Sequence, residues 1–362
     1  MRADDLTVLD VTRYRLQLRA QEATTLPPFL GSTLRGAFGH ALKRSVCIMR
    51  PRDCAQCLVA DQCIYPYLFE TVAPPGLPRS GYQQAPHPFI LSPPIFYPAD
   101  VRSTRKAADP VEPLNRSPLP GIGAQRNFPE KIARPSERHH LAAGEMLTFD
   151  LTLIGRAIEC LPYVLYTVSE MARQGLGVGR ARFELTRAEV VADGDMTREI
   201  YDCVSQKIIV DSSRENLGEM VRTRLATLKH DDILKLRFLT PTRIRVEGTP
   251  QSNPRFDLLA RNLLRRVLLL ASLHGESPIE FDSRELIERA SQITTHSNEL
   301  RWWDLDRYSN RQQTKIKIGG FIGEIAFAGE GLEQFLPLVA AGELLHVGAG
   351  TSFGLGRYQI IT

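Results

Sequence analysis

The chain has 362 residues, of which 43% are hydrophobic and 24% are charged, a balance typical of a globular protein long enough for two domains. Its net charge is only +4, so bulk charge does not by itself indicate a nucleic-acid partner. Because no apolar run reaches membrane-spanning length and the first residues do not form a signal peptide, we expect a cytoplasmic protein with no membrane partner.

The first half of the chain alternates between strand and helix patterns. In order, the periodicity predicts a strand over residues 6–20, a helix over 32–46, a strand over 145–155, a helix over 157–173, and a glycine-rich loop over 175–179 that leads into an alternating strand. A proline-rich insert interrupts this half, since residues 71–140 hold 14 of the 24 prolines. Within the insert only residues 88–97 have the composition of a strand.

The second half repeats the same order of elements. Its patterns predict a strand over 233–247 with a break at 240–241, helices over 256–273 and 283–292, a strand over 314–328 with a bulge or turn at 319–320, a helix over 332–341, a glycine-rich loop over 346–357, and a closing strand. Each half thus follows the βαββαβ order of a ferredoxin-like unit. We predict an α+β fold of two tandem ferredoxin-like (RRM-like) domains, residues 1–195 and 196–362.

The predicted helix over 32–46 carries its polar groups on one face. Gly36, Gly39, His40 and Lys43 lie opposite the apolar positions. Each glycine on such a face costs about 1 kcal/mol of helix stability relative to alanine. The two glycines would be explained if another backbone lies against this face.

The glycine-rich loop holds four glycines within nine residues, at Gly348, Gly350, Gly354 and Gly356. The sequence after them excludes a P-loop, which needs Lys and Ser or Thr, and a dinucleotide fold, which needs a helix. A nest of backbone N–H groups for phosphate and a plain hairpin turn both remain open.

Four cysteines cluster within residues 47–63. Their spacing allows one tetrahedral ion to be held by four thiolates, with Cys-x2-Cys as half of the site. We favour a structural zinc over an iron–sulfur cluster, which uses the same ligands, and over four unrelated buried thiols. The ligands would be these: Cys47, Cys54, Cys57 and Cys63.

Two histidines are candidates for proton transfer. His40 lies on the polar helix face one turn before Lys43, and histidine can give or take a proton near neutral pH. The alternative is an ordinary surface histidine. His346 precedes the glycine-rich loop, where a structural role is somewhat favoured over contact with phosphate or acid–base chemistry.

Residues 301–318 interleave aromatic and basic side chains. Rings and guanidinium groups side by side suit RNA, through base stacking and phosphate pairing. The alternative is a strand edge protected by lysines.

Taken together, these motifs resemble those of the repeat-associated RNA-binding (RAMP) superfamily. The pattern His-Val-Gly-Ala-Gly-Thr-Ser-Phe-Gly-Leu-Gly-Arg-Tyr over residues 346–358 is similar to the glycine-rich loop of its CRISPR precursor-RNA-processing endoribonucleases. The stretches 236–244, 308–312 and 318–325 support this likeness. The stretch 29–42 and the cysteine cluster look like a cysteine-bearing branch of the family.

The resemblance implies an endoribonuclease that binds CRISPR repeat RNA and cuts precursor crRNA without metal. The ribose 2′-OH attacks the adjacent phosphate, leaving a 2′,3′-cyclic phosphate and a 5′-OH. His40 matches the proton-transferring histidine of many members, with Lys43 or Arg35 as charge stabiliser. Because the catalytic residues vary in the family, the substitutes would be these: His346, Tyr308 and Lys315.

The resemblance also implies RNA contacts along the same motifs. The residues concerned are Arg35, Arg44, Arg243, Arg307, Tyr308, Arg311, Lys315, Lys317, Gly348, Gly350, Gly354, Gly356 and Arg357. Two other functions remain open: a non-catalytic RAMP subunit that holds guide RNA beside other subunits of a CRISPR effector complex, and a zinc-stabilised nucleic-acid-binding or scaffold protein outside CRISPR.

Overall fold

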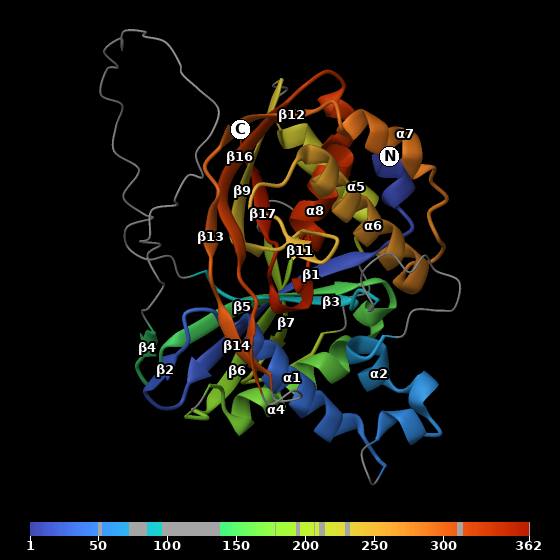
Figure 1. Cartoon of the computed structure of the whole chain (residues 1–362). Helices are drawn as coiled ribbons and strands as arrows, with labels where there is room; N and C mark the ends of the chain where they lie inside the picture. The colour runs from blue at the N-terminus through green and yellow to red at the C-terminus, as the bar shows by residue number, and fades with distance from the viewer. Residues whose placement is uncertain are drawn as a thin grey trace, which may run out of the picture.

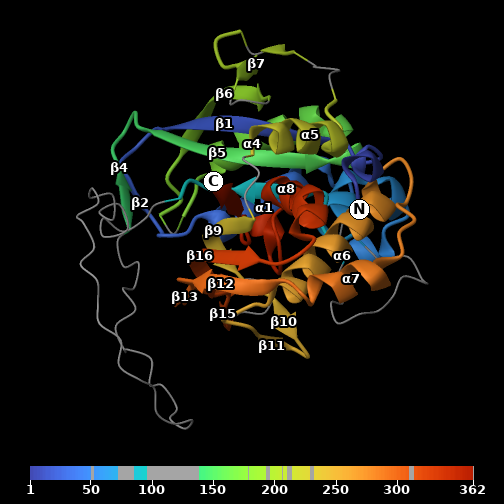
Figure 2. The ribbon, with the colours of Figure 1, turned by 90° about the horizontal axis from the view of Figure 1, so that it is seen from above.

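The computed structural model is a mixed α+β protein built on two antiparallel sheets (Figure 1), which confirms the predicted α+β class. Seen from above, the two sheets form separate layers (Figure 2). The structure describes residues 1–49, 53–71, 85–95, 138–177, 179–192, 196–205, 207–209, 214–228, 232–309 and 314–361.

The first sheet has six strands in the order β3-β5-β1-β6-β7-β8. Their bounds are β1 (Val11–Ala20), β3 (Phe89–Ser92), β5 (Met146–Ile154), β6 (Phe183–Val191), β7 (Thr197–Asp202) and β8 (Lys207–Ile208). Helices α1 (Gly31–Val46) and α4 (Leu161–Gln174) share one hydrophobic core with this sheet. The chain therefore runs β1, α1, β3, β5, α4, β6, which is a βαββαβ sequence of elements.

Strand β1 forms because apolar and polar side chains alternate along it. Leu16 is fully buried under the helices, whereas the neighbouring arginines point to the opposite face. On that face Arg15 Nε lies 3.1 Å from Asp150, and Arg19 Nη2 lies 2.7 Å from Glu184. The outward face of this sheet is therefore partly neutralised by carboxylates.

Helix α1 forms because one apolar side chain returns at each turn. Leu34, Phe38 and Leu42 follow one another at i, i+4 and i+8, and all three are buried. The helix ends where the Cys47 N–H donates to the Lys43 carbonyl at 3.1 Å and the backbone becomes extended. Cationic side chains in this last turn complement the helix dipole.

The second sheet repeats the arrangement. Its order is β12-β16-β9-β17, with β13 also paired to β16. The strands are β9 (Ile233–Thr242), β12 (Thr294–Asn298), β13 (Arg301–Trp303), β16 (Gly320–Ala328) and β17 (Tyr358–Ile361). The helices of this half are α5 (Leu217–Thr227), α6 (Phe256–His274), α7 (Ser283–Ala290) and α8 (Leu336–Leu345). They lie on one side of the sheet in Figure 1.

The N-terminus belongs to the core of the second half. A short 3₁₀ helix, η1 (Ala3–Leu6), packs beside α5, and the N-terminus lies among the helices of that half (Figures 1 and 2). Leu6 and Leu9 are fully buried in the core that contains α6 and α8. Conversely, β7 and β8 lie beyond residue 195 and extend the first sheet. The division at 195/196 remains a prediction.

Strand β3 joins the two halves because both of its faces are buried. Phe89 and Leu91 face the core of α1 and α4, whereas Ile90 between them lies in the core of the second half. Such continuous burial needs an unbroken apolar run, which β3 supplies within the proline-rich insert. The predicted strand over 88–97 is thereby confirmed in part.

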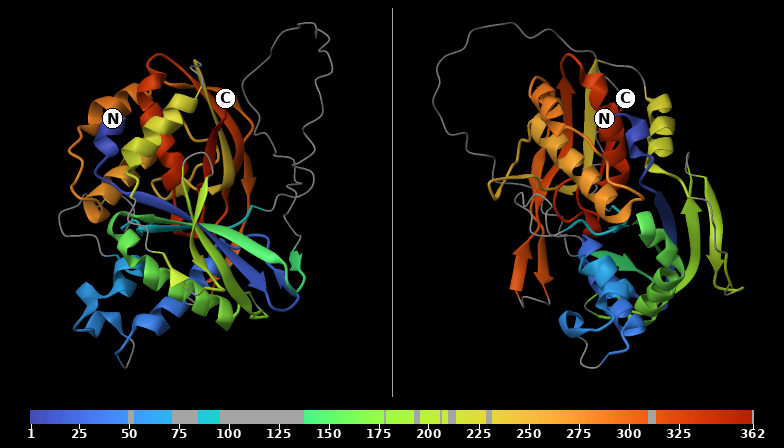
Figure 3. Two further views of the ribbon diagram at one scale, coloured as in Figure 1. Left: turned by 180° about the vertical axis from the view of Figure 1, so that it is seen from behind. Right: turned by 90° about the vertical axis from the view of Figure 1, so that its right-hand side faces the viewer.

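Smaller elements complete the described chain. They are helix α2 (Ile64–Phe69), the pair β2 (Thr24–Leu26) and β4 (His139–Leu141), the pair β10 (Arg245–Val246) and β11 (Thr249–Pro250), the hairpin β14 (Asp306–Ser309) and β15 (Thr314–Lys317), and the 3₁₀ segments η2 (Cys54–Gln56), η3 (Ala60–Gln62), η4 (Gly155–Cys160), η6 (Leu332–Phe335) and η7 (Thr351–Phe353). The hairpin extends from the second sheet to the level of α1 (Figures 1 and 3).

Candidate nucleic-acid interface

The glycine-rich loop lies at the junction of the two halves, because its turn η7 packs against both α1 and β3. A Cβ atom on Gly354 would lie 2.5 Å from the Leu91 carbonyl oxygen, and one on Gly31 would collide with the Phe353 carbonyl oxygen. Gly354 also has a φ of +80°, which disfavours other residues. These glycines allow the backbones of the two halves to touch.

The polar groups of the loop are largely satisfied inside the protein. The Gly356 N–H donates to the Pro241 carbonyl at 3.1 Å, and the Ala349 N–H donates to the Arg243 carbonyl at 3.0 Å. Thr240 Oγ1 donates to the Gly354 carbonyl at 2.8 Å. Gly354 and Gly356 are buried, whereas Gly348 and Gly350 are half-buried. Packing at the junction accounts for these hydrogen bonds, and contact of the loop with RNA stays a prediction.

Arg35 connects α1 to this loop. Its Nε donates to Ser352 Oγ at 3.0 Å, and its Nη2 lies 2.9 Å from His87 Nε2. The guanidinium carbon lies 4.6 Å from the ring centre of Phe353 and 5.0 Å from that of Phe69, both within cation–π range. Arg35 is therefore held among packed groups at the junction. The contacts of Arg35 with His87 and Phe69 were not predictable from the sequence, because they arise only from the folded arrangement.

The outward face of α1 carries the predicted proton-transfer residue. Gly36, His40 and Arg44 are all exposed, and their i, i+4, i+8 spacing places them in one row along the helix. Lys43 lies beside this row, with Nζ 4.8 Å from the ring centre of Tyr65. Partial burial works against its charge, but Tyr65 and the Cys54 thiol outweigh it and raise the pKa of Lys43. Its ammonium group therefore stays charged at neutral pH.

His346 is buried, with 4% of its surface exposed. Its Nδ1 lies 3.2 Å from the Leu355 carbonyl oxygen, and its φ of +60° ends helix α8. Burial, reinforced by the charges of Arg357 and Arg266, lowers the pKa of His346 to about 3, so the ring is neutral at pH 7. This environment favours the structural role over the catalytic role that the sequence left open.

A small polar cavity of about 30 Å³ lies beside His346, between the two halves. Asp150 and Glu343 line it together with Arg13 and Arg357. A space of this size suits a water molecule rather than a nucleotide. It therefore belongs to the packing of the junction.

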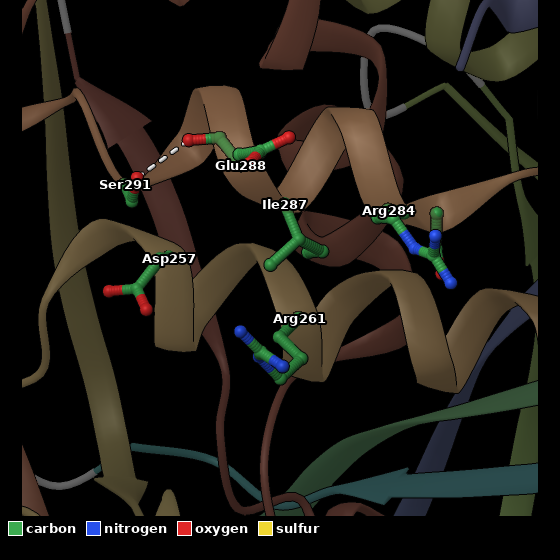
Figure 4. A pocket seen from close by; sticks show the side chains of 7 residues that line it. Asp257, Arg261, Arg284, Ile287, Glu288 and Ser291 are labelled. Atoms are coloured by element: carbon green, nitrogen blue, oxygen red, sulfur yellow. Dashed lines mark hydrogen bonds between the residues drawn. The ribbon is translucent and has the colours of Figure 1, made fainter.

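A larger hollow of about 420 Å³ lies elsewhere, between α6 and α7 (Figure 4). Asp257 and Glu288 line it together with Arg261 and Arg284. The two carboxylates offset the charges of the two guanidinium groups, so the hollow has no excess positive charge to attract a phosphate. We therefore place no part of the candidate interface there.

The predicted zinc site would be formed by four clustered cysteines in the first half of the chain. Cys47, Cys54, Cys57 and Cys63 are half-buried free thiols, and the described residues contain no group of three or more His, Cys, Asp or Glu side chains able to hold a metal ion. Four thiolates must converge on one centre to bind zinc or an iron–sulfur cluster. The zinc and cluster predictions therefore find no support in this arrangement.

The basic and aromatic stretch forms the β14–β15 hairpin. Arg307 pairs with Ile316, and Tyr308 pairs with Lys315 across the two strands. The side chains of Arg307, Tyr308 and Lys315 and all of Arg311 lie outside the described residues. Two described residues lie at the base of the hairpin, and one of them, Lys317, is exposed. The other, Arg243, donates from Nε to the Gly319 carbonyl at 3.0 Å and from Nη2 to the Lys317 carbonyl at 3.0 Å.

The fold and its junction place the chain in a known class of proteins. The family AF_1859_N, described as an N-terminal domain, matches residues 9–115 and 122–212, more than half of the chain, and the chain belongs to this family. Residues 236–358 match the family of CRISPR-associated endoribonuclease Cas6. Over these residues the resemblance to CRISPR RNA-processing endoribonucleases is confirmed.

Known proteins share this organisation over its full length. An uncharacterized protein of Archaeoglobus fulgidus is 24% identical over 353 residues, which cover 97% of this chain and 98% of the relative. The solved Cas6 product complex has a TM-score of 0.51 at 17% identity and covers 97% of this chain and 99% of that chain; its protein is from Thermus thermophilus. A partial Cas6-RT-Cas1–Cas2 complex has a TM-score of 0.53 at 12% identity, covering 98% of this chain and 46% of that chain. At these identities the two structures show the fold alone.

Membrane insertion through a helix finds no basis in the described residues, since none of their helices is long and apolar enough to cross a bilayer.

Proposed function

We propose that this protein is a metal-independent endoribonuclease that binds CRISPR repeat RNA and cleaves precursor crRNA. In this proposal the chain forms two tandem ferredoxin-like domains, residues 1–195 and 196–362. The match of residues 236–358 to the Cas6 endoribonuclease family supports the activity, and the strand orders of the two sheets support the presence of two ferredoxin-like units.

One observation carries the proposal furthest: His40 is exposed on a helix that is fixed at the junction of the two halves. The Arg35–Ser352 hydrogen bond and the contact of Gly31 with Phe353 hold α1 against the glycine-rich loop. An RNA strand that lies on both halves would reach His40 from solvent. A general acid or base must be accessible to the substrate in this way.

The proposed reaction is an internal transesterification. His40 takes the proton from the ribose 2′-OH, or returns one to the departing 5′ oxygen, while the 2′ oxygen bonds to phosphorus and the bond from phosphorus to the 5′ oxygen breaks. The products carry a 2′,3′-cyclic phosphate and a 5′-OH. Lys43, whose ammonium group stays charged at neutral pH, stabilises the negative charge that develops on the phosphate oxygens.

Cleavage of labelled repeat RNA in EDTA tests the proposal. We expect cutting at one position, a 2′,3′-cyclic phosphate end, and no cutting of RNA that carries a single 2′-deoxy nucleotide at that position, because the nucleophile is then missing. Binding without cutting would favour the non-catalytic guide-RNA subunit. Failure to bind repeat RNA would contradict both and leave a scaffold function.

A further inference from the structure

Gly36 has no structural reason to be glycine. It lies inside α1, about one and a half turns after its first residue, and is exposed. A Cβ atom built on it meets nothing within 4 Å, and its φ is not positive. Alanine would therefore fit without strain and would stabilise the helix.

The other glycines of α1 are explained by their neighbours. A Cβ atom on Gly31 would collide with the Phe353 carbonyl oxygen, and one on Gly39 would lie 2.8 Å from the ring of Phe69. Among the glycines that the structure describes, only Gly36 and Gly179 combine an ordinary φ with empty space around the Cβ position. Gly179 lies in a turn, so Gly36 is the one that weakens a regular helix.

The position of Gly36 relates it to the proposed chemistry. It precedes His40 by four residues, about 6 Å along the helix axis, in the exposed row that continues to Arg44. Suppose that the scissile phosphate of the RNA lies at His40. If the next phosphate lies at Arg44 or above Gly36, the RNA strand runs along this row. At Gly36 alone in the row no side chain separates the strand from the helix backbone.

We propose that Gly36 is a positioning residue: the sugar–phosphate backbone of the RNA, next to the scissile phosphate, packs directly against α1 at this glycine. This inference rests on the proposed function. A side chain at residue 36 would lift the strand away from the helix and move the scissile phosphate out of reach of His40. Glycine at this position lowers the stability of the helix, and it allows the RNA backbone to approach the helix closely.

Two substitutions of increasing size, Gly36→Ala and Gly36→Leu, test the inference, with Gly179→Ala as the matched control. The readouts are the melting temperature, the single-turnover cleavage rate of repeat RNA, and the Kd for the same RNA with a 2′-deoxy nucleotide at the cleavage position. We expect Gly36→Ala to raise Tm by about 1–2 °C and to slow cleavage about 10-fold or more, since a displacement of about 1 Å can cost up to 10²-fold. Gly36→Leu should slow cleavage further and weaken binding.

A raised Tm together with slower cleavage in Gly36→Ala would separate the proposed role from a purely structural one, which predicts no loss of cleavage when the helix becomes more stable. Gly36→Ala with a raised Tm and wild-type cleavage, or Gly36→Leu with wild-type rate and Kd, would overturn the inference while the proposed function stands. A slowing of cleavage of the same size in Gly179→Ala would also overturn it.

If the wild-type protein binds repeat RNA without cutting it, an unchanged Kd in Gly36→Leu overturns the inference. If the wild-type protein binds no repeat RNA, the proposed function fails first and the inference fails with it.

Discussion

The Nε–H of Arg35 on α1 donates a hydrogen bond of 3.0 Å to Ser352 Oγ in the glycine-rich loop. These residues are 317 positions apart in the chain, yet they fix the helix that carries His40 to the C-terminal half. The rings of Phe69 and Phe353, both within cation–π range of the guanidinium group, strengthen the connection. The junction therefore sets the position of the proposed proton-transfer group.

Removing this connection should weaken the fold. We expect Arg35→Ala to lower the free energy of unfolding by about 2–3 kcal/mol, because it loses charged hydrogen bonds and cation–π contacts in a half-buried site. Urea denaturation measures the change. Arg44→Ala is the matched control, being exposed on the same helix, and should change stability by no more than about 0.5 kcal/mol. Equal effects from both would show that Arg35 does not hold the junction.

Stability should depend on pH through His346. Its folded pKa of about 3 lies below the unfolded value of about 6.5, so the folded state binds fewer protons between these values. Stability is therefore fully present above pH 6.5 and is lost as the pH falls toward 3. At pH 5 the loss from this residue should be roughly 2 kcal/mol.

The contribution of His346 is isolated by His346→Asn, since asparagine tolerates the positive φ better than most residues. Urea denaturation at pH 7 and pH 5 should show a smaller pH effect in this variant than in the wild type. His296→Asn, at an exposed histidine on β12, should leave the pH effect unchanged. An unaltered pH effect in His346→Asn would show that the ring is not neutral and buried in solution.

Metal removal should leave the fold intact. Because the described residues contain no group of three or more side chains able to hold a metal ion, we expect the same melting temperature before and after dialysis against EDTA, and no stoichiometric zinc or iron by elemental analysis. A bound ion at one per chain, together with a lower Tm after EDTA, would establish the four-thiolate site and contradict this arrangement.

Lys317 should contribute to RNA binding through one phosphate. It is exposed at the end of β15, where Arg243 fixes its backbone. We expect Lys317→Ala to weaken binding of repeat RNA and to reduce the slope of log K against log salt by about 0.7, the value for one contact to a single strand. Lys207→Ala, at an exposed lysine on the edge strand β8, should leave the slope unchanged. The same slope in Lys317→Ala and wild type would remove this residue from the interface.

Local periodicity explains why most elements were predictable. The strand expected over 145–155 is β5, and the helix expected over 256–273 is α6, because each carries its own hydrophobic pattern. Helix α5 was missed although Leu217, Met220 and Val221 are buried and recur at helical spacing. Its packing against η1, from the far end of the chain, could not be predicted, because periodicity contains no information on distant partners.

Some residues of the candidate site were likewise predictable from the sequence, and others were not. His40 was found because histidine on a polar helix face is visible in the sequence. The position of His87 beside Arg35 was not, since β3 reaches the junction only by long-range pairing with β5. Cysteine spacing suggested zinc, but spacing alone does not fix whether thiols meet in space.

The central claim is that His40 transfers a proton during cleavage, and His40→Gln tests it most directly. Single-turnover cleavage of repeat RNA in EDTA is measured for this variant and for His296→Gln, with the Kd for the 2′-deoxy RNA as a check on binding. The proposal predicts a rate 10²–10⁴-fold lower in His40→Gln, an unchanged Kd, and wild-type cleavage in His296→Gln. Cleavage at the wild-type rate in His40→Gln would contradict the proposal.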